Sequence, residues 1–277
     1  MATTAISIVG ILNVTPDSFS DGGHFYNNID KAAQRVKEMI AQGADSIDIG
    51  GESTRPGSQG VSVEEELRRV LPVIEIVRKE LGERFPVSID TYKASVAEAA
   101  LEHGATTVNS LGGFTFDPTL ATVIAKHKCS IVIYHIKGQP RTMQVGEIKY
   151  QDVIGDITQF FRAQIELGLQ KGIAKKQFII DPGIGFGKTV EQNVKIVKRL
   201  KEFKKIGLPI MVGVSRKSHL GKLLQQKLNL SKIPVPEERI EAALAETAVA
   251  IRNGATIIRT HDVFETKRFV TILESLI

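Results

Sequence analysis

The chain has 277 residues, a hydrophobic share of 42% and 24 glycines. Its 36 basic and 31 acidic residues give a net charge of +5 and are interspersed without a long basic run. A nucleic-acid partner is therefore not indicated, whereas an anionic small substrate fits. The length allows one barrel domain or two small domains. We expect one domain over residues 1–277, because no shift in composition divides the chain.

The cysteine content and the apolar runs indicate a cellular compartment. Cys129 is the one cysteine, so no internal disulfide can form, which is typical of a reducing environment. We expect this thiol to be a small core residue. Residues 1–8 lack the basic and apolar regions of a signal peptide. No apolar run approaches the roughly 20 residues of a membrane-spanning helix. We expect a cytoplasmic protein without a membrane partner.

Short apolar runs, typical of strands buried on both faces, alternate with amphipathic stretches along the chain. The strands are predicted at residues 6–12, 46–49, 87–89, 106–108, 130–134, 178–180, 210–214 and 256–258. Capping-box patterns at Ser62 and Thr189 mark the starts of two of the intervening helices, and an Ala-rich helix is predicted over residues 237–253. Eight strand-then-helix units favour closure into a (β/α)8 TIM barrel, with a doubly wound open sheet as the alternative.

Polar or ionisable residues follow all eight apolar runs. They are Asn13, residues 52–55, Asp90, Asn109, His135, Asp181, residues 215–218 and residues 259–261. Asp and Asn are also common turn residues, but turns alone explain eight polar tips poorly. Because barrel chemistry gathers at the carboxyl ends of the strands, the sequence predicts a site there. The long polar segments 13–23 and 50–57 are predicted to cover it as binding loops.

Three further patterns concern phosphates and metals. Residues 181–189 lack a Walker A motif, because Pro182 stands where that motif needs glycine. Basic residues within 215–218 and 259–262 favour a phosphate site beside a helix N-terminus, the alternative being a solvated patch with Asp262 as a helix cap. The six histidines are scattered, so tightly bound zinc is not expected. A magnesium ion held partly by substrate phosphates would leave almost no trace in the sequence.

Taken together, these motifs resemble dihydropteroate synthase. Residues 13–23 (NVTPDSFSDGG) and 48–57 (DIGGESTRPG) resemble two signatures of that family. Further matches follow in the family's order at residues 88–91, at His135 with 138–144, and at 181–186, 215–218 and 259–263. Nearly the whole chain is covered. The resemblance implies a (β/α)8 barrel, a homodimer and a sulfonamide target. Departures from the family pattern are Ser110 for Asp, Ile136 for Met and Thr260 for an apolar residue.

The resemblance implies a transferase that joins 6-hydroxymethyl-7,8-dihydropterin diphosphate to 4-aminobenzoate, giving 7,8-dihydropteroate and diphosphate in folate biosynthesis. In the implied dissociative displacement, diphosphate leaves before the amine attacks. The carboxylate of Asp90 stabilises the cationic methylene that remains. The implied catalytic residues are Asp90, Lys217, Arg259 and His261.

The implied pterin site consists of Asp181, Asn109 and Asp90 at the aminopyrimidinone edge, Lys217 at the ring carbonyl and nitrogen, and Phe186 against the ring. A carboxylate accepts such a donor edge bidentately, as it accepts a guanidinium.

Arg259 and His261 are implied to hold the diphosphate, with Thr54 and Arg55 closing over it. Asn13 is implied to bind the cofactor Mg²⁺ shared with the diphosphate. Stabilising the departing group is the main electrostatic task of such a site.

The implied 4-aminobenzoate site uses Ser218 and a helix N-terminus for the carboxylate. Phe19 and Pro56 wall the ring, and Thr54 and Lys217 complete the site. Two alternatives stay open at this point. One is a methyltransferase of the same pterin-binding kind, which would have no use for diphosphate-binding residues. The other is a pterin-binding paralogue without turnover, which the departures at Ser110 and Ile136 motivate.

Overall fold

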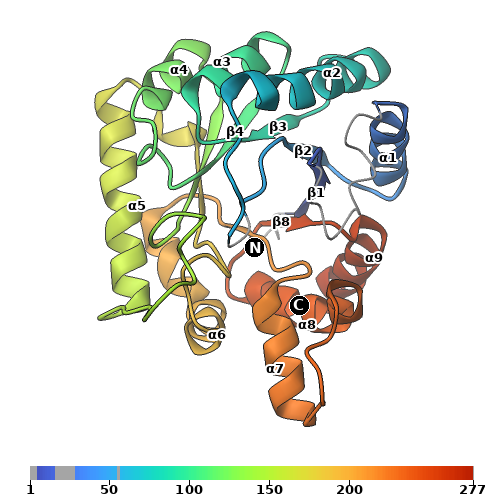
Figure 1. Cartoon of the computed structure of the whole chain (residues 1–277), viewed down its shortest axis with the longest axis vertical. Helices are drawn as coiled ribbons and strands as arrows, with labels where there is room; N and C mark the ends of the chain where they lie inside the picture. The colour runs from blue at the N-terminus through green and yellow to red at the C-terminus, as the bar shows by residue number, and fades with distance from the viewer. Residues whose placement is uncertain (1–4, 16–28, 55–56, 277) are drawn as a thin grey trace.

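The structure is a computed structural model that describes residues 5–15, 29–54 and 57–276. Strands and helices alternate along the chain, with the helices arranged outside the strands (Figure 1). The strands are β1 (Ser7–Asn13), β2 (Ser46–Gly50), β3 (Val87–Asp90), β4 (Thr107–Leu111), β5 (Ser130–Tyr134), β6 (Phe178–Asp181), β7 (Met211–Val212) and β8 (Ile257–Thr260).

The α-helices are α1 (Ile29–Ala41), α2 (Val63–Leu81), α3 (Ala94–Glu102), α4 (Leu120–His127), α5 (Val153–Gln170), α6 (Val190–Lys198), α7 (Ser218–Leu228), α8 (Ile240–Arg252) and α9 (Val263–Glu274). Short 3-10 helices are η1 (Lys175–Gln177), η2 (Leu200–Ile206) and η3 (Pro236–Arg239). The helix predicted over 237–253 is thus divided between η3 and α8. Both predicted caps form: the hydroxyls of Ser62 and Thr189 accept from the backbone of Glu65 and Gln192.

The eight strands form a parallel barrel. Their order is β6-β5-β4-β3-β2-β1-β8-β7. The remaining gap between β6 and β7 is bridged by a parallel pairing of Ile180 with Ile210 and by the Ile180 N–H, which donates to the Pro209 carbonyl at 3.0 Å. This contact joins the two ends of the sheet. The predicted (β/α)8 TIM barrel is confirmed, and the open doubly wound sheet is wrong.

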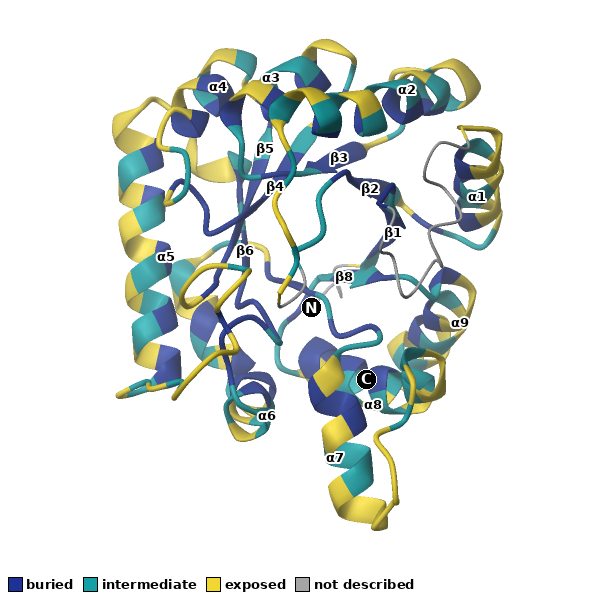
Figure 2. Cartoon of the chain, viewed as in Figure 1, coloured by how far each residue is buried: buried dark blue, intermediate teal, exposed yellow. Residues whose placement is uncertain are grey.

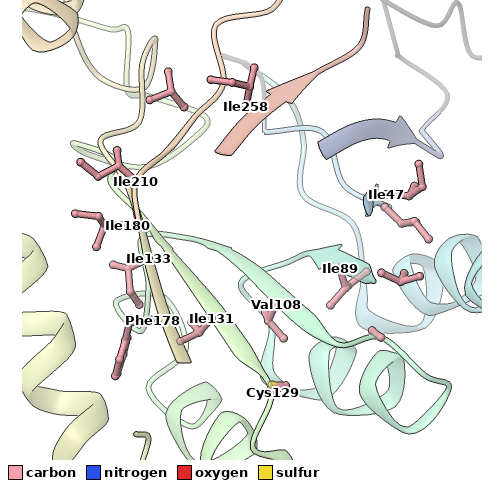
Figure 3. Close-up of a cluster of buried hydrophobic side chains, with 14 of the residues drawn as sticks. Ile47, Ile89, Val108, Cys129, Ile131, Ile133, Phe178, Ile180, Ile210 and Ile258 are labelled. Carbon is pink, nitrogen blue, oxygen red and sulfur yellow. The ribbon is translucent and has the colours of Figure 1, made fainter. Parts of the chain in front are cut away.

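Side chains alternate between the two faces of each strand, because successive residues of a strand point in opposite directions. Outward residues such as Ile47, Ile89 and Val108 pack with the helices in one continuous core (Figure 3). Buried side chains line the strands and the inner faces of the helices, while the exposed ones lie on the outer helix faces (Figure 2). Cys129 lies in this core, as expected.

The predicted strand ends need a correction that bears on the site. Asn13, Asp90 and Asp181 were expected just past their strands, but each is the last strand residue. Asn109 and Arg259 lie within β4 and β8. An apolar run covers only the part of a strand whose side chains are apolar on both faces. Near the carboxyl end, polar side chains face the barrel interior, so the run ends before the strand does.

We expect Phe161→Ala to destabilise the fold by about 3–5 kcal/mol, because its fully buried ring leaves a cavity when removed. The ring packs edge-on against Phe203, with ring centroids 5.7 Å apart. Phe264→Ala is the matched control, since that ring is 46% exposed, and its cost should stay within about 0.5–1 kcal/mol. Urea unfolding followed by circular dichroism measures both. Equal losses would contradict this account of the core.

Candidate active site

A cavity of about 480 Å³ opens at the carboxyl ends of the strands. It brings together eight residues predicted from sequence: Asn13, Thr54, Asp90, Phe186, Lys217, Ser218, Arg259 and His261. Asp181 lines a smaller adjoining pocket with Tyr134. Asn109 is buried in the barrel interior. Phe19, Arg55 and Pro56 lie outside the described residues.

An arginine between two carboxylates forms the floor of the cavity. The Nε of Arg259 donates to Oδ2 of Asp48 at 2.6 Å, and its Nη2 donates to Oδ2 of Asp90 at 2.7 Å. The amide of Asn109 donates to the same Asp48 oxygen at 3.0 Å. Charge-assisted bonds of this kind are strong and directional. They fix the orientation of Arg259, Asp90 and Asn109 relative to one another.

Sequence reasoning assigned no role to Asp48, although the residue stood inside a quoted motif. Its side chain is 1% exposed and pairs with Arg259 of β8 across the barrel. The signal in the sequence was a charged residue inside the apolar run 46–49. Buried carboxylates are rare without a partner, so this Asp called for a cation that the sequence alone did not identify.

Burial raises the pKa of two carboxyl groups at the site, Asp90 and Asp181. Desolvation raises the pKa of Asp90 to about 7, although Arg259 opposes the shift. Burial likewise raises the pKa of Asp181 to about 6, although the Gly183 N–H that donates to its Oδ1 at 2.7 Å opposes it. Both carboxyl groups therefore change charge close to neutral pH, as groups at functional sites often do.

Aromatic packing positions the lysine at the cavity wall. The Nζ of Lys217 lies 4.0 Å from the centroid of the Phe186 ring. Phe186 in turn packs edge-on against Tyr134, with centroids 4.6 Å apart. A cation over a ring face is attracted by the ring quadrupole. The arrangement places the ammonium group between Phe186 and the pocket that Asp181 lines.

A buried lysine, Lys188, holds the segment that follows β6. The Nζ of Lys188 donates to the carbonyls of Gly183 and Phe186 and lies 2.9 Å from Nδ1 of His135. Burial lowers the pKa of both Lys188 and His135. This lysine is turned into the protein, consistent with the sequence-based exclusion of a Walker A loop. His135, one of the eight strand tips, supports the loop and does not line the cavity.

The adjoining side of the cavity is formed by the ends of β7 and β8. The Oγ of Ser215 lies 3.1 Å from Nδ1 of His261, and Nε2 of His261 lies 3.5 Å from the Asn13 amide nitrogen. Ser215 also donates to Asp262 at 3.1 Å, and Arg216 pairs with the same carboxylate at 2.6 Å. Asp262 occupies the N-cap position of α9, but its side chain makes no capping hydrogen bond to the helix and binds Ser215 and Arg216 instead.

The three departures from the family pattern are accommodated by local packing. The buried hydroxyl of Ser110 donates to the Gly113 carbonyl at 2.6 Å. Ile136 packs in a small apolar cluster with Phe186, and Thr260 pairs with the Thr266 hydroxyl at 3.1 Å. Neither Ser110 nor Thr260 lines the cavity. These substitutions alter its surroundings without placing a new charged group in it.

Candidate metal ligands are few. Within the described parts of the chain, Glu98, Glu102 and His127 could together surround an ion. Glu102 and His127 are the last residues of α3 and α4, and Glu98 lies one turn before Glu102 in α3, so none of the three lines the cavity. In the cavity, Asn13 offers one amide oxygen. In the same described residues, no helix is long and apolar enough to cross a membrane.

Comparison with known proteins agrees with this geometry. A family described as "Pterin binding enzyme" matches residues 9–261. The dihydropteroate synthase of Synechocystis is 46% identical over 97% of this chain and 89% of its own length. The Yersinia pestis dihydropteroate synthase, solved with a sulfonamide drug, superposes with a TM-score of 0.90 at 40% identity, over 100% of this chain and 95% of its own.

A third relative was solved with a substrate-sized ligand. The Xanthomonas albilineans dihydropteroate synthase with 4-aminobenzoic acid superposes with a TM-score of 0.88 at 35% identity, covering 100% of this chain and 94% of its own. These similarities extend over nearly the full length of both chains and include the strand ends that build the cavity. The chain belongs to the dihydropteroate synthase family of pterin-binding enzymes.

Proposed function

We propose that this protein condenses 6-hydroxymethyl-7,8-dihydropterin diphosphate with 4-aminobenzoate, giving 7,8-dihydropteroate and diphosphate for folate biosynthesis. The observation that carries the proposal is one cavity in which Asp90, Lys217, Arg259 and His261 meet, with Asp181 in an adjoining pocket. The test is incubation with both substrates and Mg²⁺, following diphosphate release. Tight pterin binding without release would support the paralogue that lacks turnover.

The methyltransferase alternative is disfavoured by the same cavity. Arg259 and His261 line the cavity, and we assign them to a diphosphate, which a methyltransferase does not bind. The relative that is 46% identical over almost the whole chain is a dihydropteroate synthase.

The pterin would occupy the end of the cavity built on strands. Asp181 would accept from the donor edge of the pterin, with Asn109 and Asp90 completing the contacts. Within the described residues, Oδ1 of Asn109 is buried and has no hydrogen-bond partner. An unpaired buried acceptor is costly, and a pterin N–H would satisfy it. Lys217 would donate to the ring carbonyl and nitrogen, and Phe186 would pack against the ring.

The diphosphate would lie beside the pterin, near Arg259 and His261. The contacts of Arg259 with Asp48 and Asp90 raise its pKa further, so it stays charged at every relevant pH. Thr54 and Arg55 would close over the phosphates. Backbone N–H groups at the start of α9, which follows β8 directly, would add partial positive charge.

The residues present fit a weakly held Mg²⁺. Asn13 lines the cavity and provides an uncharged oxygen, which suits an ion whose other ligands are phosphate oxygens and water. A bound Mg²⁺ would neutralise charge on the diphosphate. The near contact of Asn13 with His261 places this amide beside the group that we assign to the diphosphate.

The reaction would proceed by loss of diphosphate. The bond between the pterin methylene carbon and the diphosphate oxygen breaks, and its electron pair leaves with the oxygen. The carboxylate of Asp90 stabilises the resulting cation. The amine nitrogen of 4-aminobenzoate then donates its lone pair to the methylene carbon and loses one proton to solvent. Arg259 and His261 stabilise the departing anion.

The 4-aminobenzoate would bind at the start of α7. Ser218 is the first residue of that helix and lines the cavity, so its hydroxyl and the helix N-terminus would hold the carboxylate. Thr54 and Lys217 would complete the site, with Phe19 and Pro56 against the ring. A sulfonamide, as bound by the Yersinia pestis relative, would compete for this position.

We also propose a cytoplasmic homodimer. The buried free thiol of Cys129 suits a reducing compartment. Apolar side chains are exposed along the end of α7 and the segment that follows it, at Leu228, Leu230, Ile233 and Val235. Clustered exposed apolar side chains often mark a protein interface, which supports this face as the contact between two subunits.

Asp181→Asn should weaken pterin binding by about 1.5–3 kcal/mol or more, because an amide presents a donor where the carboxylate had only acceptors. Titration calorimetry with 6-hydroxymethyl-7,8-dihydropterin measures the effect without a contribution from phosphates. Asp30→Asn, on the exposed first turn of α1, is the control. Unchanged pterin affinity in Asp181→Asn would remove this residue from the pterin site.

Pterin binding should weaken as the pH falls. The raised pKa values, about 7 for Asp90 and about 6 for Asp181, mean that both groups lose charge between pH 8 and 5. Because the charged form accepts the pterin donors, affinity should be full at about pH 8 and above and should decline as the pH falls through this window. Calorimetry with the phosphate-free pterin avoids titration of the substrate phosphates. A constant affinity down to pH 5 would refute the assignment.

Turnover should require Mg²⁺ although the purified protein holds no tightly bound metal. Excess chelator should abolish diphosphate release, and added Mg²⁺ should restore it. Asn13→Ala should raise the Mg²⁺ concentration that gives half-maximal rate. Full activity in chelator would contradict the magnesium assignment, and stoichiometric zinc by elemental analysis would contradict the proposed donor set.

A further inference from the structure

Beside the cavity, one ammonium group is shared by two buried carboxylates. The Nζ of Lys93 lies 2.5 Å from Oε2 of Glu52 and 2.6 Å from Oε2 of Glu66. The side chains of Glu52 and Glu66 are 7% and 1% exposed, and that of Lys93 is 17% exposed. Glu52 follows β2, Glu66 lies in α2, and Lys93 precedes α3. None of the roles assigned above uses them.

The same groups tie together the two ends of the loop that follows β2. Oε2 of Glu52 accepts from the Val61 N–H at 3.2 Å, and Lys93 donates to the Val61 carbonyl at 2.8 Å. The Tyr92 hydroxyl donates to the other Glu52 oxygen at 2.6 Å. Positions 52 and 61 are therefore held by one cluster, which we call the loop clamp: Glu52, Glu66, Tyr92 and Lys93.

The loop clamp lies next to the part of the loop that reaches the site. Glu52, Ser53 and Thr54 line the cavity. The backbone before them is tied as well, because Arg69 of α2 donates to the Gly51 carbonyl at 2.8 Å. A side chain at position 51 would meet Val70 and Glu66 at 2.7 and 3.0 Å, so glycine allows this close approach. The position of Thr54 is thus fixed by contacts that begin at Gly51, three residues before it.

Stability alone is a poor explanation for the loop clamp. Two carboxylates and one ammonium leave an excess of buried negative charge, and apolar residues of similar size often stabilise a fold at least as well. Charge-assisted hydrogen bonds are directional, so they fix the relative positions of the groups that they join. Catalytic and binding groups on loops need such support, because a displacement of about 1 Å can cost a hundredfold in rate.

We infer that Lys93 is a positioning residue for the second substrate. Through Glu52 and Glu66 it holds the loop so that Thr54 faces the cavity. The hydrogen bonds of its ammonium group reach the loop and α2, to Glu52, Val61 and Glu66. Glu66 acts on Asp90 only through its charge. Loss of Lys93 therefore affects the binding of 4-aminobenzoate and of the diphosphate group, for both of which Thr54 is assigned, and leaves the hydrogen bonds of the pterin ring itself in place. The inference rests on the proposed function for the identity of the second substrate.

The test is Lys93→Met, which keeps the length of the side chain and removes its charge and donors. The KM for 4-aminobenzoate should rise at least about tenfold, because a displaced binding group loses most of its contribution. The dissociation constant of the phosphate-free pterin should stay within about twofold. Lys126→Met is the matched control: it removes an exposed lysine that pairs with Glu98 at 2.6 Å on the outer helices and should change neither value.

Two milder variants keep the inference testable if Lys93→Met fails to fold. Glu52→Gln removes the charge but keeps an acceptor for Val61, and Tyr92→Phe removes one hydrogen bond. Both should raise the same KM, Tyr92→Phe the less. If the three variants lose thermal stability while both substrate affinities stay unchanged, or if pterin affinity falls equally, the positioning role is refuted.

A second readout does not depend on turnover. Hydrogen exchange of the peptide covering residues 52–62 should be faster in Lys93→Met and unchanged in Lys126→Met. Absent condensation by the wild-type chain would refute the proposed function but leave this measurement valid. Unchanged exchange in a folded Lys93→Met protein would show that the clamp does not hold the loop.

Discussion

The site depends on the pairing of Arg259 with Asp48 and Asp90 inside the barrel. One guanidinium from β8 satisfies carboxylates from β2 and β3. Without it, two negative charges would lie together in a poorly hydrated space, and breaking a buried pair by removing one partner typically costs about 3–5 kcal/mol. Asp48 then orients Asn109 of β4. A single cation thus organises groups from three other strands.

This arrangement explains how one interior can hold several carboxylates near neutrality. Burial raises the pKa of Asp90 and of Asp181, while Arg259 and Lys217 act in the opposite direction. The opposing effects leave Asp181 able to accept hydrogen bonds from the donor edge of the pterin. They also leave the Asp90 carboxylate next to the carbon on which we propose that positive charge develops. Arg259 and His261 line the same cavity and suit the leaving anion, so the cavity combines two electrostatic tasks over a short distance.

The two ends of the cavity are held by different means. Asp90 and Asn109 project from strands that pair with a parallel strand on both sides, and Asp181 projects from β6, which pairs with β5 on one side and is bridged from Ile180 to Ile210 on the other. Groups on rigid elements are positioned precisely without further help. Loop residues need additional contacts: the carbonyls of Gly183 and Phe186 are held by Lys188, and the segment after β2 is held by the loop clamp. Buried lysines therefore serve both loops as multiple donors.

The sequence by itself determined the barrel and most of the residues that line its mouth. Eight apolar runs alternating with amphipathic stretches favour buried parallel strands covered by helices, the resemblance to a known family implied the barrel, and a polar group followed each run. What only the tertiary structure decided is which polar groups meet. Asp48 and Arg259 are 211 positions apart and Lys93 and Glu52 are 41 apart. Such contacts exist only because the closed barrel brings distant strands and loops together. The local periodicity of the sequence does not indicate which distant side chain a given residue contacts.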